Sequence, residues 1–245
     1  MSLLNLLSFA QTEVSEETYK LVGLIAIIAL AVLAVIMLVL CLAYKKMDTK
    51  AVVYAAVCLA GSFVLSFLKI APVTYGGSIT LASFVPILIY AYVYGPVRGL
   101  LIGLIYGVLQ FIQDPYMLTP VTFLLDYLLA FVGIFLIGVT RILFKKENVA
   151  VFTGTAAAYI WRFVMHFISG LIYFRMGAVW ADIPASSAGV YSLLYNLVYL
   201  LPDMIITMVV MVILVATKNF PRLVRLMRPD FYAAKQDAAD GTCEA

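Results

Sequence analysis

The chain has 245 residues, of which 65% are hydrophobic and 12% charged, and its formal net charge is +3. This composition excludes a soluble globular domain and is typical of a polytopic membrane protein. Because His166 is the only histidine, the sequence argues against a histidine-based metal site. The odd number of cysteines indicates neither a disulfide framework nor a metal cluster, and two of them lie in apolar runs: Cys41, Cys58 and Cys243.

The N-terminal part contains the first expected span, residues 21–44, which is uncharged and long enough to cross the hydrocarbon layer. Residues 1–18 include three glutamates, and they lack the basic start and small-residue cleavage site of a signal peptide. Three basic residues follow the span, Lys45, Lys46 and Lys50. Since cytoplasmic loops hold an excess of lysine and arginine, we expect the N-terminus outside and this basic run in the cytoplasm.

Residues 51–70 form the second expected span, in which Ala56 and Ala60 lie one helical turn apart on the same face. Small side chains at this spacing allow another helix to approach closely. The span is expected to end outside the membrane in an irregular loop that contains Pro72, Tyr75, Gly76 and Gly77.

The third expected span, residues 81–94, is short and includes Pro86, which is expected to kink the helix or to mark its packed side. The fourth span carries glycine at every fourth position, and this pattern favours tight helix packing over ligand contact: Gly99, Gly103 and Gly107.

The fifth expected span, residues 119–143, runs inward. The sixth, residues 150–172, runs outward, and after an outer loop at 174–190 the seventh, residues 191–217, runs inward. Every dense cluster of lysine and arginine then falls on one side of the membrane, as the positive-inside rule requires. We therefore expect a cytoplasmic C-terminus, with the polar tail after Pro229 disordered.

Asp126 lies in the fifth span and needs an explanation, because a charged side chain at the centre of a membrane helix costs roughly 3 kcal/mol. Tyr127 is adjacent to it, and Tyr116 lies in the loop just upstream. A carboxylate between phenol rings is suited to hold an organic cation, since the acid supplies charge and the rings supply quadrupole attraction. The alternative is a structural acid that pairs with Arg162 or accepts hydrogen bonds from the backbone.

Polar and aromatic residues from three expected helices meet at one depth near the outer surface, if depth is counted at about 1.5 Å per helical residue. They are Asp126, Tyr127, His166, Tyr191 and Asn196, beneath loops that carry Tyr75, Tyr116 and Phe174. Gly170 shares a helix face with His166 and is expected to leave room beside the imidazole. Asn196 offers donors and an acceptor that suit a nitrogen heterocycle. Together these residues predict a pocket open to the outside, although a lone histidine is usually structural and a lone tyrosine there is typical of the interfacial belt.

Arg162 and Asp203 lie near the centres of the sixth and seventh expected spans, which are consecutive and antiparallel. Charged side chains inside a membrane almost always pair with one another or line a path for substrate. We therefore expect these two side chains to form a structural ion pair.

Four blocks follow one another along the chain: GGSITLASFVPILIYAYVYGPVRGLLIGLIYGVLQF, PYMLTPVTFLLDYLLAF, RFVMHFISG and YSLLYNLVYLLPD. Their order and spacing resemble the thiamine-specific S component of energy-coupling factor (ECF) transporters, the ThiT family. The resemblance covers residues 51–217 and implies a six-helix membrane subunit that binds thiamine from outside. It also implies that transport requires a transmembrane coupling subunit and two cytoplasmic ATPase subunits. The span at 21–44 lies outside the resemblance and has no assigned role.

The resemblance implies roles for individual residues. The implied ligand contacts are Asp126 with Tyr127 and Tyr116 at the thiamine cation, His166 and Gly170 from the sixth span, and Tyr191 and Asn196 at the pyrimidine. Ala56 and Ala60 correspond to a small-residue motif that docks on the coupling subunit. Two departures are that Phe174 stands where some members have tryptophan, and that Asp126 stands in place of a longer glutamate.

The sequence therefore predicts an all-α polytopic protein of the cell membrane, a six-helix S-component bundle with one additional N-terminal helix. Residues 1–50 would hold the external N-terminus and extra helix, residues 51–217 the substrate-binding domain, and residues 218–245 a basic cytoplasmic segment and tail. No Walker A loop is present, so ATP hydrolysis would belong to the partner subunits, and no cofactor or nucleic acid is expected. The alternatives are an S component for another vitamin or a thiamine precursor, an intramembrane enzyme using Asp126 and His166 as acid and base, and a purely structural membrane protein.

Overall fold

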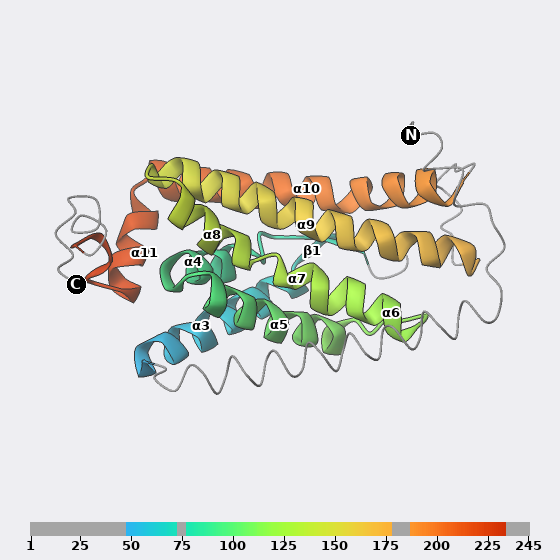
Figure 1. The fold of residues 1–245 in the computed structure, drawn as a ribbon, viewed down its shortest axis with the longest axis horizontal. Coiled ribbons are helices and arrows are strands. Elements are labelled where there is room, and N and C mark those ends of the chain that lie inside the picture. Colours follow the sequence, from blue (N-terminus) through green and yellow to red (C-terminus); the bar gives the residue numbers. More distant parts are fainter. Residues whose placement is uncertain (1–47, 73–76, 178–186, 234–245) are drawn as a thin grey trace.

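The computed structural model describes residues 48–72, 77–177 and 187–233, most of which are helical (Figure 1). The elements, in chain order, are α3 (Thr49–Phe67), β1 (Lys69–Pro72), β2 (Ser78–Thr80), α4 (Val85–Tyr94), α5 (Pro96–Gln113), α6 (Pro120–Phe123), the π-helix η3 (Leu124–Leu129), α7 (Ala130–Val132), α8 (Phe135–Leu143), α9 (Glu147–Arg175), α10 (Ala188–Ala216) and α11 (Asn219–Met227). The expected span at 21–44, Tyr75 and the tail beyond residue 233 lie outside the described residues.

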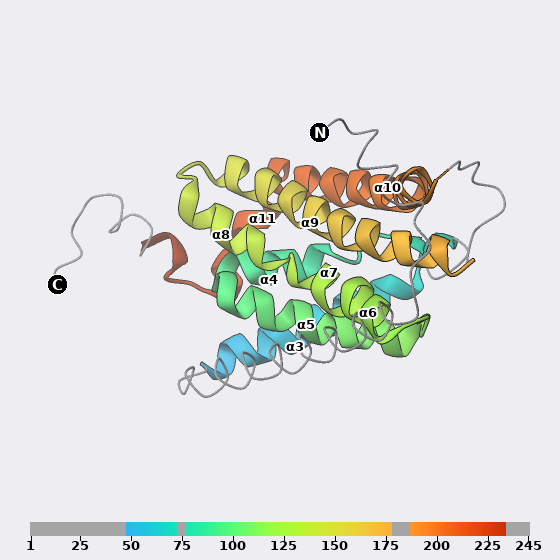
Figure 2. The ribbon, with the colours of Figure 1, turned by 45° about the vertical axis from the view of Figure 1, so that its right-hand side comes forward.

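Five helical runs in the described part are long and apolar enough to cross a membrane: Thr49–Phe67, Pro96–Gln113, Pro120–Leu143, Glu147–Arg175 and Ala188–Ala216. Large apolar side chains are exposed on their outer faces, among them Ile105, Ile160 and Ile205. Both views show α9 running beside α8 and α10 (Figures 1 and 2). These features confirm the prediction of a helical polytopic membrane fold.

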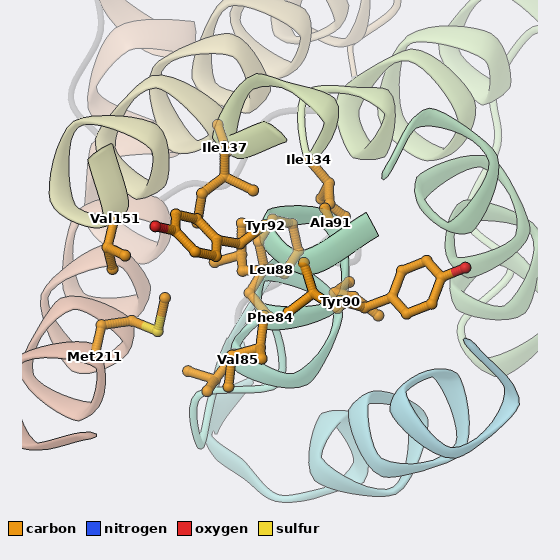
Figure 3. Packing of buried hydrophobic residues seen from close by; sticks show 14 of the residues in the cluster. Phe84, Val85, Leu88, Tyr90, Ala91, Tyr92, Ile134, Ile137, Val151 and Met211 are labelled. Carbon is orange, nitrogen blue, oxygen red and sulfur yellow. The ribbon is translucent and has the colours of Figure 1, made fainter. Parts of the chain in front are cut away.

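Helix α4 lies at the centre of the bundle and is apolar on all sides, as a fully buried helix should be. Its side chains pack against Ile137, Val151 and Met211 from the surrounding helices and against Ile134 from the turn before α8 (Figure 3). At about 1.5 Å per residue its 10 residues reach only half of the roughly 30 Å hydrocarbon layer. Pro86 stands in the first turn, where its missing N–H leaves no intrahelical bond unmade, so it does not interrupt the helix. It lies against Gly61 of α3, in agreement with the other expectation, that this proline marks a packed side.

An antiparallel β-hairpin replaces the end of the second expected span and part of the irregular loop predicted after it. Helix α3 ends at Phe67, and β1 then pairs with β2 in a register that places Lys69 opposite Thr80. The backbone N–H and the hydroxyl of Thr80 both donate to Asp203 Oδ1, at 2.9 and 2.8 Å. Non-helical backbone is tolerated within a membrane bundle when it is buried in protein or lines a cavity, and this hairpin is held against α10 by a carboxylate.

The glycine stripe of α5 packs against the helix that carries Asp126. A Cβ atom added at Gly103 would overlap the carbonyl oxygen of Phe131, and one added at Gly107 would overlap that of Tyr127. The backbones of α5 and of the η3–α7 segment are therefore in direct contact. This confirms the packing interpretation of the stripe and fixes the position of η3.

The C-terminal segment is ordered further than the sequence predicts. Helix α11 buries Phe220, Val224 and Met227 against the core, and beyond Pro229 the side chain of Phe231 is only 6% exposed. The basic segment expected from residue 218 therefore packs on the domain through α11, and the first residues of the tail expected to be disordered after Pro229 pack on it as well. A short amphipathic helix of this kind is stabilised by tertiary contacts that no local pattern specifies.

The packing of α11 on α4 predicts different effects on stability when two tyrosines of α4 are replaced by phenylalanine. Tyr94 donates its hydroxyl to the carbonyl oxygen of Met227 at 2.8 Å, so Tyr94→Phe is expected to lower the free energy of unfolding by about 1 kcal/mol. The buried hydroxyl of Tyr92 has no hydrogen-bond partner among the described residues, so Tyr92→Phe should be neutral or stabilising. Thermal unfolding in detergent measures both. An unchanged melting temperature for Tyr94→Phe would show that this bond does not hold α11.

Candidate ligand-binding site

Asp126 and Tyr127 lie in the π-helix η3, which was not predicted. The N–H of Ala130 donates to the carbonyl oxygen of Leu125, five residues back, instead of the usual four. Such segments are rare and occur frequently at functional sites, because the extra residue in the turn redirects side chains. Here the turn places a carboxylate inside the bundle, facing α9.

The carboxylate of Asp126 is held by two side chains of α9. Its Oδ1 lies 2.8 Å from Nδ1 of His166, and its Oδ2 accepts a hydrogen bond of 2.6 Å from the hydroxyl of Ser169. Only 12% of the Asp126 side chain is exposed. Under the structural alternative, Arg162 was expected to pair with this acid directly. Instead, the imidazole of His166 lies between the guanidinium and the carboxylate.

The protonation state of His166 follows from its second neighbour. Nε of Arg162 lies 3.3 Å from Nε2 of His166, and a guanidinium can only donate. Nε2 is therefore the acceptor, so the single proton of a neutral imidazole is on Nδ1 and is donated to Asp126. The network thus contains a neutral histidine between a carboxylate and a guanidinium.

Arg162 also forms the ion pair expected from the sequence, with its Nη1 at 3.3 Å from Oδ2 of Asp203. The same guanidinium lies 4.9 Å from the ring centres of Phe84 and Phe131. The connected groups are thus two carboxyl groups, one guanidinium and one neutral imidazole, so that with both acids ionised the network would carry one net negative charge.

This network borders a cavity with an open mouth. Of the residues predicted for the site, those that line the cavity are Asp126, Tyr127, Tyr116, His166, Gly170, Tyr191 and Asn196. Phe174 is not among the lining residues. It belongs to the last turn of α9, not to a loop, and packs on Tyr191 with 5.4 Å between ring centres. Tyr75 lies outside the described residues.

Two predicted contacts differ in detail from the expectation. A Cβ atom at Gly170 would overlap Oγ of Ser192, so the space expected beside the imidazole is filled by α10. The amide of Asn196 donates to the carbonyl oxygen of Ser192 at 2.8 Å and accepts from the hydroxyl of Tyr199 at 2.9 Å. The amide also donates to Oγ of Ser192 at 3.2 Å, so a heterocycle that accepts from Asn196 would have to displace one of these bonds, whereas Oδ1 can accept from one more donor.

Three tyrosines that line the cavity were not predicted, Tyr173, Tyr195 and Tyr199, whereas Tyr116 and Tyr191 beside them were. Tyr191, Tyr195 and Tyr199 recur every four residues on one face of α10, and successive ring centres are 5.8 and 5.5 Å apart. The ring of Tyr173, which also lines the cavity, stacks on Tyr116 with 5.4 Å between ring centres. The four-residue spacing of the three α10 tyrosines was visible in the sequence, and such a spacing places side chains on one helix face.

The mouth of the cavity carries a second polar group of residues that the sequence did not predict. Nζ of Lys69 on β1 lies 2.8 Å from Oδ2 of Asp114, which follows α5. Tyr127 joins this group to the interior, because its hydroxyl donates to the carbonyl oxygen of Asp114 at 2.6 Å. No local signal identifies the pair, since Lys69 reaches the mouth only through the unpredicted hairpin.

Ala56 and Ala60, the residues predicted to dock on a partner, are both exposed on α3 and do not line the cavity. The neighbouring Val53 and Val57 on this helix are 54% and 62% exposed. This face of α3 is covered by none of the described residues.

Comparison with known proteins gives consistent matches. Residues 52–222 match the model of a family described as thiamine transporter protein. The thiamine transporter ThiT of Bacillus subtilis (strain 168) is 31% identical over 160 residues, which cover 61% of this chain and 80% of that protein. The structure of ThiT from Listeria monocytogenes superposes with a TM-score of 0.60 over 71% of this chain and 96% of the other, at 21% identity. The structural match supports the fold alone.

Proposed function

The chain belongs to the thiamine transporter family, and on this premise we propose that it is the substrate-binding membrane subunit of an ECF-type importer that captures thiamine from the outside. The family consists of transporters, so the interpretation as an intramembrane enzyme is not retained. The finer proposal concerns the ligand, the direction of binding and the partners.

The observation that carries the proposal is that two acids of the network beside the cavity, Asp126 and Asp203, share a single arginine, Arg162. Thiamine contains a permanently cationic thiazolium ring, an aminopyrimidine and a hydroxyethyl arm. A cation near Asp126 would supply a second positive charge, and the tyrosines that line the cavity would add attraction between the cation and the ring faces. Because the site is largely shielded from water, this attraction is screened less than it would be at a surface.

Titration calorimetry of the purified protein tests the proposal. We expect saturable binding of thiamine and much weaker binding of its neutral pyrimidine half, since the latter lacks the cation. A protein that prefers the pyrimidine half would instead support the alternative of an S component for a thiamine precursor. Absence of thiamine binding by correctly folded protein would contradict the proposal.

The proposed partners are a transmembrane coupling subunit and two cytoplasmic ATPase subunits, because the chain has no Walker A loop of its own. The exposed face of α3 with Ala56 and Ala60 is a suitable docking surface for the coupling subunit, since small residues permit close approach of helices in a membrane. The proposed orientation has the cavity mouth outside and α11 at the cytoplasmic end, in agreement with the positive-inside rule.

Replacing both Ala56 and Ala60 by Trp should impair docking on the coupling subunit without impairing thiamine binding. Thiamine affinity of the isolated subunit is expected to stay within about threefold, while thiamine uptake by cells should be abolished because the added volume blocks close helix contact. The matched control replaces Val209 and Ile213 with Trp, two residues of α10 at the same spacing that are 51% and 52% exposed. Uptake equally impaired by the control, or retained by the α3 variant, would contradict docking through Ala56 and Ala60.

A further inference from the structure

We propose that the pair of Lys69 and Asp114 at the cavity mouth makes the site selective for unphosphorylated thiamine over its phosphate esters. This inference rests on the proposed function and adds a specificity determinant to it. Asp114 is the residue that excludes the esters, and Lys69 moderates the exclusion.

Exposure distinguishes the mouth from the interior of the cavity. The side chains of Lys69 and Asp114 are 29% and 46% exposed, whereas those of His166 and Asp126 are 11% and 12% exposed. All four residues line the same cavity. A strongly hydrated phosphate group attached to the ligand would therefore be accommodated at the mouth and not in the interior, where it would also meet the acids of the Asp126 network.

At the mouth, a phosphate meets a cation that is already paired. Lys69 lies 2.8 Å from Asp114, so binding of a phosphate to Lys69 either displaces the carboxylate or leaves two negative groups beside one ammonium. Like charges that share a partly dehydrated site disfavour each other. The hydroxyl of thiamine carries no such penalty, because it can donate to the carboxylate or accept from the ammonium.

Hydrogen bonds hold the backbone around Asp114 in place. Its backbone carbonyl accepts a hydrogen bond of 2.6 Å from Tyr127, which belongs to the helix of Asp126. Beside it, Oε1 of Gln113 accepts from the hydroxyl of Ser66 at 2.6 Å and from Nε2 of Gln110 at 3.2 Å. This network fixes the backbone at the end of α5, so the carboxylate of Asp114 can leave Lys69 only by rotation of its own short side chain.

The test compares the dissociation constants of thiamine and thiamine monophosphate by titration calorimetry. In Asp114→Asn the ratio of the monophosphate constant to the thiamine constant should fall at least about tenfold from the wild-type value, because the repelling charge is gone. In Lys69→Gln the ratio should rise by a similar factor, because Asp114 then acts without its counter-charge. The matched control is Asp230→Asn, which removes an exposed acid at the other end of the molecule, 3.6 Å from Arg228; it should leave the ratio unchanged.

The outcomes separate this inference from the proposed function. If wild-type protein binds thiamine and neither variant changes the ratio, the selectivity role of the pair is wrong while the proposed function stands. If wild-type protein does not bind thiamine, the proposed function itself fails. Should Asp114→Asn fail to fold, Lys69→Gln decides alone, since a lowered or unchanged ratio there contradicts the proposal.

Discussion

Arg162→Ala is expected to lower the free energy of unfolding by about 3–5 kcal/mol, because removing one partner of a buried ion pair strands the other charge. Asp203 is nearly inaccessible, with 2% of its side chain exposed, and Arg162 is its only cationic contact in the described part of the chain. The same change frees Nε2 of His166 and leaves the network with two carboxylates and no cation. Thermal unfolding in detergent, with and without thiamine, measures the loss.

A second substitution distinguishes a stranded charge from a simple loss of packing. Adding Asp203→Asn to Arg162→Ala removes the unpaired charge, while the amide oxygen can still accept from Thr80, whose N–H and hydroxyl now donate to Asp203 Oδ1. The double variant should therefore be more stable than Arg162→Ala alone. If the double variant loses as much as the two single variants added together, the pair is not energetically coupled.

The sequence located the polar centre of the molecule correctly for a physical reason. Charged side chains are costly in a membrane unless they meet one another or line a cavity. Counting depth along antiparallel helices was therefore sufficient to bring Asp126 close to His166, and Arg162 close to Asp203. The contacts among these four residues are now visible, but their roles in ligand binding remain predictions.

The sequence could not predict the connections within this centre, because they depend on how each helix is rotated about its axis. Arg162 was considered as a direct partner of Asp126, yet His166 lies between them, since Arg162 and His166 are one turn apart on the same helix. The π-helical turn that directs Asp126 toward α9 has no sequence signature comparable to a cap or a proline. The prediction of free space beside Gly170 was wrong for the same reason, because Ser192 of the neighbouring helix α10 fills it.

The hairpin and α11 illustrate a second limit. Apolar composition predicted a span through residue 70, but helix α3 ends at Phe67. The backbone hydrogen-bonding groups after it are satisfied by the pairing of β1 with β2, and the hairpin is held by the bonds from Thr80 to Asp203. Likewise, the basic residues near α11 indicated a cytoplasmic segment, while its packing depends on Phe220 and Phe231 meeting a distant core. Long-range contacts of this kind override local preference.

Asp126→Asn tests the electrostatic basis of the site. The substitution preserves shape and one hydrogen-bond acceptor but removes the charge of the acid. An ion pair at 4 Å contributes about 1 kcal/mol in water and considerably more in a partly dehydrated pocket. We therefore expect thiamine affinity to fall at least a hundredfold, equivalent to about 2.8 kcal/mol. Asp126→Glu keeps the charge, so it should retain more affinity than Asp126→Asn and serves as the control.

The most direct measurement is calorimetric titration of wild-type and Asp126→Asn protein with thiamine and with its neutral pyrimidine half. A cation held by Asp126 requires that thiamine lose much more affinity than the pyrimidine half does. If Asp126→Asn binds thiamine within threefold of wild type, Asp126 does not hold the cation, and its role is confined to the structural hydrogen bonds with His166 and Ser169.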